Sequence, residues 1–169
     1  MFLNCELCEA LKSLKDWTLV GSFAVGGFEY MGFSISDSNK LIVISSDRET
    51  VFDSRDGSIT DIEAVIDETK FQAMVDILPD ELIPIAGIYG GILPSGTPQG
   101  DKVEISYYGE HVISGKKLKY QQITFIDRFG NRQKIFDSYP SYVCGFSNDG
   151  NSFALAHDGG VYVHRRSDC

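Results

Sequence analysis

Short apolar runs separated by polar turns dominate the hydrophobic pattern of this chain. Residues 40–44 form a run that is apolar after its first position, and such a run is typical of a buried strand. Gly26-Gly27 separates two β-prone runs and indicates a hairpin turn. We therefore expect β hairpins over 17–57 and a β meander over 102–166, with the clearest strands at 122–126, 153–156 and 160–164.

Two segments instead have the period of a helix. In residues 4–16, leucines recur at i, i+4 and i+7, and Asn4 can cap the first turn. In the acidic segment 58–81, Thr60 to Glu63 has the form of a capping box, and a stripe at helical spacing follows it, made of Phe71, Met74, Val75 and Leu78. We expect a helix in each segment, the second of them central and acidic.

Glycine and proline are concentrated in residues 82–101, where we expect a loop. The sequence then predicts a single domain over 1–169. Its fold class is α+β, mostly antiparallel β, with an N-terminal helix and a central acidic helix.

Two hairpin-like segments are similar to each other. Residues 39–53 and 151–163 each contain an apolar run, a polar turn and a second β-prone run, and Phe146-Ser147-Asn148-Asp149-Gly150 precedes the second segment. This pattern resembles a blade of a WD-type β-propeller, which implies antiparallel hairpin sheets. A closed propeller needs at least four blades of about 40 residues. Two helices and a glycine loop leave too little chain for that, so we expect blade-like sheets without closure.

The composition indicates an ordinary folded domain. The chain has 169 residues, of which 43% are hydrophobic, and a single domain of this length can bury a sizeable core. No apolar run approaches the roughly 20 residues that cross a bilayer. The N-terminus lacks the basic start and apolar stretch of a secretory signal, so we expect a cytoplasmic protein that does not bind a membrane.

The negative charge is concentrated in one segment. The formal net charge is -9, and residues 47–81 hold eleven acids against three bases. A solvated surface explains such a segment, and so does an electropositive partner, because a patch of one sign steers association. Calcium is disfavoured because the Asp-x-Asp-x-Asp-Gly spacing is absent. The acidic balance also argues against nucleic acid.

The candidate chemistry is sparse. Cys5-Glu6-Leu7-Cys8 has redox or zinc spacing, but its flanking acids disfavour a thiolate, and only Cys144, His157 or His164 could complete a zinc site. We interpret Cys5 and Cys8 as buried helix residues and expect no metal or cofactor.

Three features suggest activity without establishing it. His157-Asp158 is a possible acid–base pair, although a turn histidine is more often only solvated. Gly87 to Gly96 lacks the lysine of a phosphate loop, so we interpret it as an irregular loop, with a role in recognition as the alternative. A basic cluster interleaved with tyrosines is the one candidate nucleic-acid patch, and a solvated hairpin face explains it better: Lys116, Lys117, Lys119, Arg128, Arg132 and Lys134. We therefore expect no enzyme.

In size, charge and lack of catalytic motifs, the chain resembles the immunity proteins of bacterial toxin systems, including those of contact-dependent growth inhibition. The resemblance implies an inhibitor that occludes the active site of a cationic toxin domain, such as a nuclease. The partner-binding residues expected under this hypothesis are Asp53, Asp56, Asp61, Glu63, Asp67, Glu68 and Asp76. The alternative is a non-enzymatic β scaffold or a subunit of a larger assembly.

Overall fold

The computed structural model describes residues 13–138 and 142–168, which form fifteen strands in four antiparallel sheets. The first sheet contains β1 (Trp17–Phe23), β15 (Gly160–Arg166), β14 (Ser152–His157) and β13 (Val143–Phe146), in that order. The second contains β5 (Ile59–Asp61), β4 (Glu49–Asp53), β3 (Lys40–Ser45), β2 (Phe28–Phe33) and β9 (Ala86–Gly87). The third contains β6 (Ala64–Asp67), β7 (Gln72–Val75) and β8 (Leu78–Pro84), and the fourth β10 (Lys102–Ile113), β11 (Lys116–Ile126) and β12 (Arg132–Ser138).

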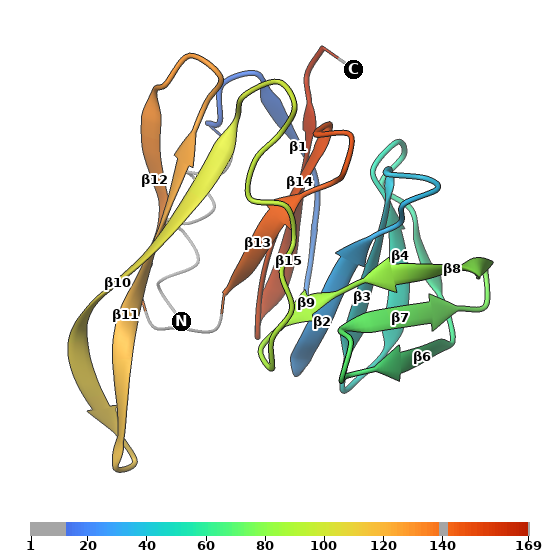
Figure 1. Ribbon diagram of the computed structural model, residues 1–169, viewed down its shortest axis with the longest axis horizontal. Helices are drawn as coiled ribbons and strands as arrows, with labels where there is room; N and C mark the ends of the chain where they lie inside the picture. Colours follow the sequence, from blue (N-terminus) through green and yellow to red (C-terminus); the bar gives the residue numbers. More distant parts are fainter. Residues whose placement is uncertain (1–12, 139–141, 169) are drawn as a thin grey trace.

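The four sheets lie side by side along the long axis of the molecule (Figure 1). The β10–β12 sheet is at one end, followed by the sheet of β13–β15 and β1, the sheet of β2–β5, and the β6–β8 sheet at the other end. Three apolar clusters fill the three spaces between neighbouring sheets. The arrangement is an open row of sheets and does not close into a ring.

The two middle sheets are covered on both faces, which explains their continuous apolar runs. On β3, Leu41 and Val43 pack toward β14, while Ile42 and Ile44 pack toward β7. On β14, Ala154 and Ala156 pack in the same cluster as Leu41. The alternate residues of β14, Phe153 and Leu155, pack on the other side, in the cluster that contains Phe125 of β11. A strand buried on both faces has no polar position to reveal its period.

The predicted α+β class is wrong, because the described residues contain no helix. The segment 58–81 forms β5, β6, β7 and the start of β8 instead of a central helix. Ala73 and Val75 face the core, and Met74 between them is exposed, so the true period is two. Asp61 of the predicted capping box pairs with Arg48, and Asp67 binds the Thr69 N–H in the β6–β7 turn at 3.1 Å.

Other predicted boundaries also change. Most of the predicted helix 4–16 lies outside the described residues, and its described end, residues 13–16, is turn and irregular backbone. The Gly26-Gly27 hairpin is wrong, since β1 and β2 belong to different sheets. Within 82–101, β8 continues to Pro84 and β9 follows. No helix in the described part of the chain is long and apolar enough to cross a membrane.

The two similar segments form equivalent hairpins, β3–β4 and β14–β15. Each is preceded by a turn in which an aspartate accepts a backbone N–H two residues later. The acceptor is Asp37 for the Asn39 N–H, at 3.3 Å, and Asp149 for the Asn151 N–H, at 3.0 Å. The repeated sequence pattern therefore reflects the same turn chemistry in two sheets.

The two ends of the described chain meet in one sheet, where β1 pairs with β15. A buried ion pair ties this sheet to the loop that enters β10. The Arg166 guanidinium donates to Asp101 at 2.7 Å and lies 4.6 Å from the Trp17 ring, and both charged side chains are at most 3% exposed. Asp101 also accepts the Arg128 N–H at 3.1 Å, which links the β11–β12 turn to the same group.

We expect Asp101→Ala to lower the free energy of unfolding by about 3–5 kcal/mol, because it leaves the Arg166 charge buried without its partner. The double variant Asp101→Ala/Arg166→Met should recover part of this loss, since neither buried charge remains. Urea denaturation followed by tryptophan fluorescence measures both.

Glu104→Ala is the matched control, because it breaks a pair with Arg132 in which both side chains are about half exposed. Its effect on stability should be small. Equal losses for Asp101→Ala and Glu104→Ala would contradict the structural role assigned to the buried pair.

Candidate functional site

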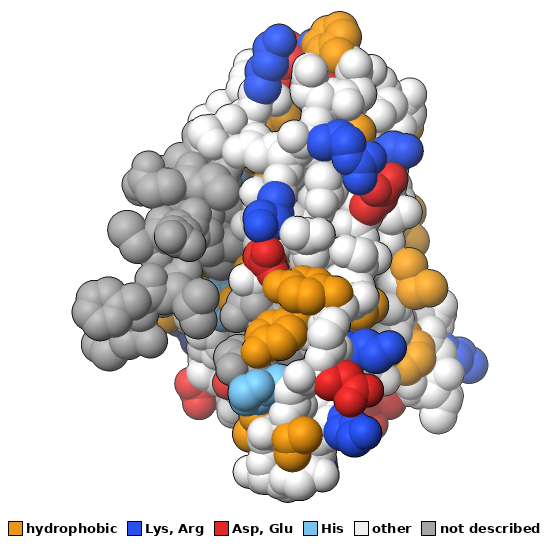
Figure 2. Space-filling model, turned by 90° about the vertical axis from the view of Figure 1, so that its left-hand side faces the viewer, with side chains coloured by type: hydrophobic (Ala, Val, Ile, Leu, Met, Phe, Trp, Pro, Cys, Tyr) orange, Lys and Arg blue, Asp and Glu red, His pale blue; other side chains and the backbone are white. Residues whose placement is uncertain are grey.

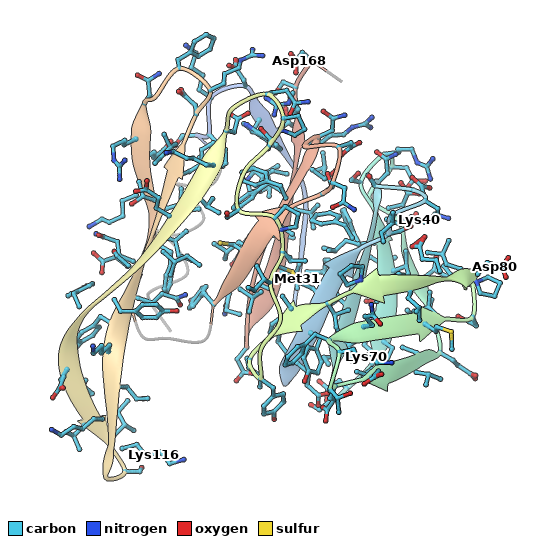
Figure 3. The ribbon with its side chains drawn as sticks, in the orientation of Figure 1. Met31, Lys40, Lys70, Asp80, Lys116 and Asp168 are labelled. Carbon is cyan, nitrogen blue, oxygen red and sulfur yellow. The ribbon has the colours of Figure 1, made fainter. Side chains whose placement is uncertain are left out.

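The most site-like feature of the surface is a pocket of about 440 Å³ beside the β6–β7 turn. Its lining combines three aromatic rings with two carboxylates: Glu29, Tyr30, Glu68, Phe71 and Tyr89. These residues come from β2, from the β6–β7 turn and from the segment that follows β9. Lys70, labelled in Figure 3, marks the β6–β7 turn.

A β-bulge sets the position of Glu29. The register between β2 and β3 shifts between Phe28 and Tyr30, which makes Glu29 the extra residue of β2. The Glu29 carbonyl accepts the Ile88 N–H at 3.1 Å, so the bulge is fixed to the segment that carries Tyr89. A bulge re-aims the side chain at its extra residue, and here that side chain joins the pocket.

A tight turn displays Tyr89. Gly87 and Gly90 exchange backbone hydrogen bonds of 2.8 and 3.2 Å, with Ile88 and Tyr89 at the tip between them. A Cβ on Gly87 would lie 1.7 Å from the Glu29 carbonyl oxygen, so only glycine permits this approach. Gly90 has a φ of +136°, and its missing Cβ leaves room for the Phe71 ring.

Phe71 is one of the few described non-glycine residues with a positive φ, at 50°. Such backbone strain gathers at functional sites when the surroundings hold it in place. Here the Phe71 carbonyl accepts the Ile85 N–H at 2.9 Å. The strained residue thereby places its ring at the pocket, with the ring centroid 6.4 Å from that of Tyr30.

Tyr30 forms the floor of the pocket and is fully buried. Its hydroxyl donates to Glu68 at 3.3 Å. Burial raises the pKa of Tyr30, and the nearby Glu68 carboxylate raises it further, so the phenol remains a neutral donor. The pocket therefore presents carboxylate oxygens and ring faces, which suit a cationic ligand.

The predicted partner-binding acids lie in several turns and do not form one cluster. Asp53 accepts the Arg55 Nε–H at 2.9 Å, and this hydrogen bond lowers the Asp53 pKa. Asp56 accepts the Ser58 N–H at 2.9 Å, which lowers the Asp56 pKa. Asp61 pairs with Arg48 at 2.6 Å. These three acids belong to the β4–β5 hairpin or to the end of β5.

The other four predicted acids lie on or beside the β6–β8 sheet. Asp67 caps the β6–β7 turn, where its hydrogen bond to the Thr69 hydroxyl lowers the Asp67 pKa. Asp76 accepts the Glu63 N–H at 3.2 Å, and these two residues flank the β6–β7 pair. Glu68 belongs to the pocket.

The side of the β6–β8 sheet that points away from the core is apolar at its centre. Val65 and Met74 are direct cross-strand partners and are 69% and 43% exposed, and Leu82 on β8 is 54% exposed. By strand alternation, Asp67 shares the face of Val65. Glu63 and Asp76 lie next to this face, just before β6 and just after β7. We call these six residues the β6–β8 outer face.

Within residues 13–138 and 142–168, the other candidate chemistry does not assemble. The His157 ring is stacked on Tyr142 and Tyr162, at centroid distances of 4.8 and 5.9 Å, and His157 Nδ1 accepts the Gly159 N–H. Cys144 is buried, which raises its thiol pKa to about 12. Cys5 and Cys8 lie outside the described residues. Among those described, no three His, Cys, Asp or Glu side chains are grouped to hold a metal.

The predicted basic cluster lies on the β10–β12 sheet and the β11–β12 turn. This sheet is at the end of the molecule opposite the acidic β6–β8 sheet. Tyr108 stacks on Tyr120 with centroids 5.4 Å apart, and its hydroxyl hydrogen-bonds to Asp137. Lys134 and Lys117 are paired with nearby acids. These tyrosines therefore contact one another on the sheet surface.

Comparison of the chain with protein-family models, curated proteins and solved structures gave no match. The site thus rests on its own geometry. Sequence reasoning found Glu68 but missed Glu29, Tyr30, Phe71 and Tyr89. The glycines of the 87–91 segment are the signal in the sequence, since they indicate an irregular turn of the kind that can serve in recognition.

Lowering the pH should destabilise this protein partly through His157. Burial lowers the pKa of His157 in the folded chain, so below pH 6.5 the unfolded chain takes up a proton that the folded chain resists. This contribution to stability is complete above pH 6.5 and is lost as the pH falls toward the lowered value. We expect His157→Phe to show a smaller drop in urea midpoint between pH 7.5 and 5.5.

Identical pH dependence in His157→Phe and in the unmodified protein would contradict the assignment.

Proposed function

We propose that this protein is a non-enzymatic inhibitor of the immunity type, which binds a basic protein partner such as a nuclease toxin domain. The observation that supports this proposal is the β6–β8 outer face, where exposed apolar side chains are flanked by carboxylates. Residues 61–84, which contain this sheet, hold seven acids and one base.

The two kinds of side chain on this face would contribute differently to binding. Exposed apolar groups at the centre of an interface supply affinity when they are removed from water. Carboxylates around them steer a cationic partner and accelerate association. A nuclease must present lysine and arginine to phosphate groups, so its active-site face is complementary to such a surface.

The two ends of the molecule differ in charge: residues 61–84 hold seven acids and one base, whereas residues 102–138 hold four acids and seven bases. Figure 3 labels Asp80 at the β6–β8 end and Lys116 at the tip of the β10–β11 hairpin, at the other end of the long axis. An oncoming cationic partner is therefore oriented toward the acidic end before contact.

The test begins with capture of the partner at low salt on the tagged protein, followed by measurement of association rates. The double variant Glu63→Lys/Asp76→Lys should slow association about tenfold or more and reduce its dependence on salt. Met74→Ala should mainly raise the dissociation rate.

The control is Asp56→Lys in the β4–β5 turn, which reverses one carboxylate of the same acidic segment, as the single variant Glu63→Lys does on the outer face. The association rate should fall far less in Asp56→Lys than in Glu63→Lys. Equal association rates for Glu63→Lys and Asp56→Lys would overturn the assignment of the outer face, and a partner that is not basic would overturn the proposal.

A second candidate function is a scaffold subunit, and a separate observation favours it. β10 is an edge strand with exposed apolar side chains along its length: Ile105, Tyr107, Tyr108, Val112 and Ile113. Figure 2, which views this side of the molecule, shows hydrophobic side chains among charged ones. An open edge of this kind can pair with a strand from another chain.

Light scattering after size-exclusion chromatography separates the two functions. The inhibitor proposal expects a monomer at micromolar concentration in low and high salt. A stable oligomer that survives high salt and dissociates in the variant Tyr107→Glu/Val112→Lys would favour the scaffold instead.

A further inference from the structure

We propose that the pocket formed by Glu29, Tyr30, Glu68, Phe71 and Tyr89 binds a guanidinium group, supplied by an arginine side chain of the protein partner. The choice of a protein as the source rests on the proposed function, whereas the chemistry of the pocket does not.

The lining residues favour a cation. Glu29 and Glu68 supply carboxylate oxygens, and no Lys, Arg or His is among the described residues that line the pocket. Lys70, the nearest base along the chain, lies 3.6 Å from the Asp67 carboxylate and is largely exposed. The accessible rings of Phe71 and Tyr89 contribute electron-rich faces, which attract cations within about 6 Å.

The arrangement of the rings favours a planar cation. The Tyr30 ring centroid lies 6.0 Å from that of Tyr89 and 6.4 Å from that of Phe71, at interplanar angles of 51° and 52°. These rings are tilted and do not stack on one another. A guanidinium can lie against one ring face and direct its N–H groups at a carboxylate, which an ammonium cannot do in the same way.

The pocket is largely preformed. The β-bulge at Glu29, the Gly87–Gly90 turn and the positive φ of Phe71 fix the backbone at each contributing segment. Tyr30 is fully buried and holds Glu68 by a hydrogen bond. A preformed site loses little conformational entropy on binding. Its volume of about 440 Å³ is in the range of small-ligand pockets and exceeds one arginine side chain.

The pocket and the β6–β8 outer face meet at the β6–β7 turn. Glu68 directly follows Asp67, which belongs to that face, and both lie in or beside the β6–β7 turn. A partner bound to the outer face could thus insert a side chain from the edge of its own interface into the pocket. Buried arginine anchors often dominate the energy of protein interfaces.

The experiment is calorimetric titration of the full chain with N-acetyl-arginine amide at low salt. N-acetyl-citrulline amide is a neutral ligand of nearly the same shape, and N-acetyl-lysine amide carries the charge without the planar group. We expect arginine to bind several-fold more tightly than lysine, and citrulline to give no measurable binding.

Glu68→Gln and Tyr89→Ala test the pocket, with Glu63→Gln as the matched loss of charge outside it. Glu68→Gln should weaken arginine binding about tenfold, because it removes a charge-assisted hydrogen bond. Tyr89→Ala should weaken it several-fold, Tyr89→Phe should keep it, and Glu63→Gln should leave it within about twofold.

Equal binding of citrulline and arginine, equal binding of lysine and arginine, or equal losses in Glu68→Gln and Glu63→Gln would each overturn the guanidinium site. Arginine binding without a basic partner would retain the pocket and remove the proposed function. A basic partner whose affinity is unchanged by Glu68→Gln and Tyr89→Ala would keep the function and remove the partner's arginine from this pocket.

Discussion

A sheet that is apolar on both faces must be covered on both faces, and this constraint determines the architecture. The sheets of β13–β15 with β1 and of β2–β5 carry buried side chains on each side, so each requires two neighbours. The β10–β12 and β6–β8 sheets supply the outer layers of the row (Figure 1). The pairing of β1 with β15 joins the two ends of the described chain in the first middle sheet. The Arg166–Asp101 ion pair then holds the loop that enters β10 against this sheet.

The surface at the acidic end follows from the same constraint. An outer sheet buries only one face, so Val65, Met74 and Leu82 are left on the face that no described sheet covers. Its short strands also require several turns, and their carboxylates bind the turn N–H groups. Asp67 and Asp76 therefore serve both the local structure and the electrostatic field of this end. Charge that is fixed by such hydrogen bonds is well suited to partner recognition, because it needs little reordering on binding.

The sequence predicted the strands of the middle sheets well, because runs such as 40–44 and 153–156 are too apolar for any exposed element. It failed in the segment 58–81 for two physical reasons. A carboxylate that caps a β-turn has the same sequence form as one that caps a helix, as Asp67 shows. In addition, Phe71, Met74, Val75 and Leu78 match a helical stripe, although Met74 faces solvent while Val75 is buried.

The pocket was harder to predict than the strands. Glu68 was found through its charge, but nothing in the sequence indicates the bulge that turns Glu29 toward it or the positive φ of Phe71. In the sequence, Tyr30 is indistinguishable from an ordinary core residue, and only the structure shows its hydroxyl beside Glu68. Long-range pairing, here β2 with β9, brings these residues together.

The central claim is that the acidic end carries a specific cation site and not only a diffuse negative field. Backbone NMR shifts recorded during titration with an arginine-containing peptide test this claim most directly. Our account predicts saturable changes at Glu29 and Tyr30, at residues 67–72 and at residues 87–91, with little change at the β4–β5 turn. Small, non-saturating changes spread over all the acidic turns would contradict it.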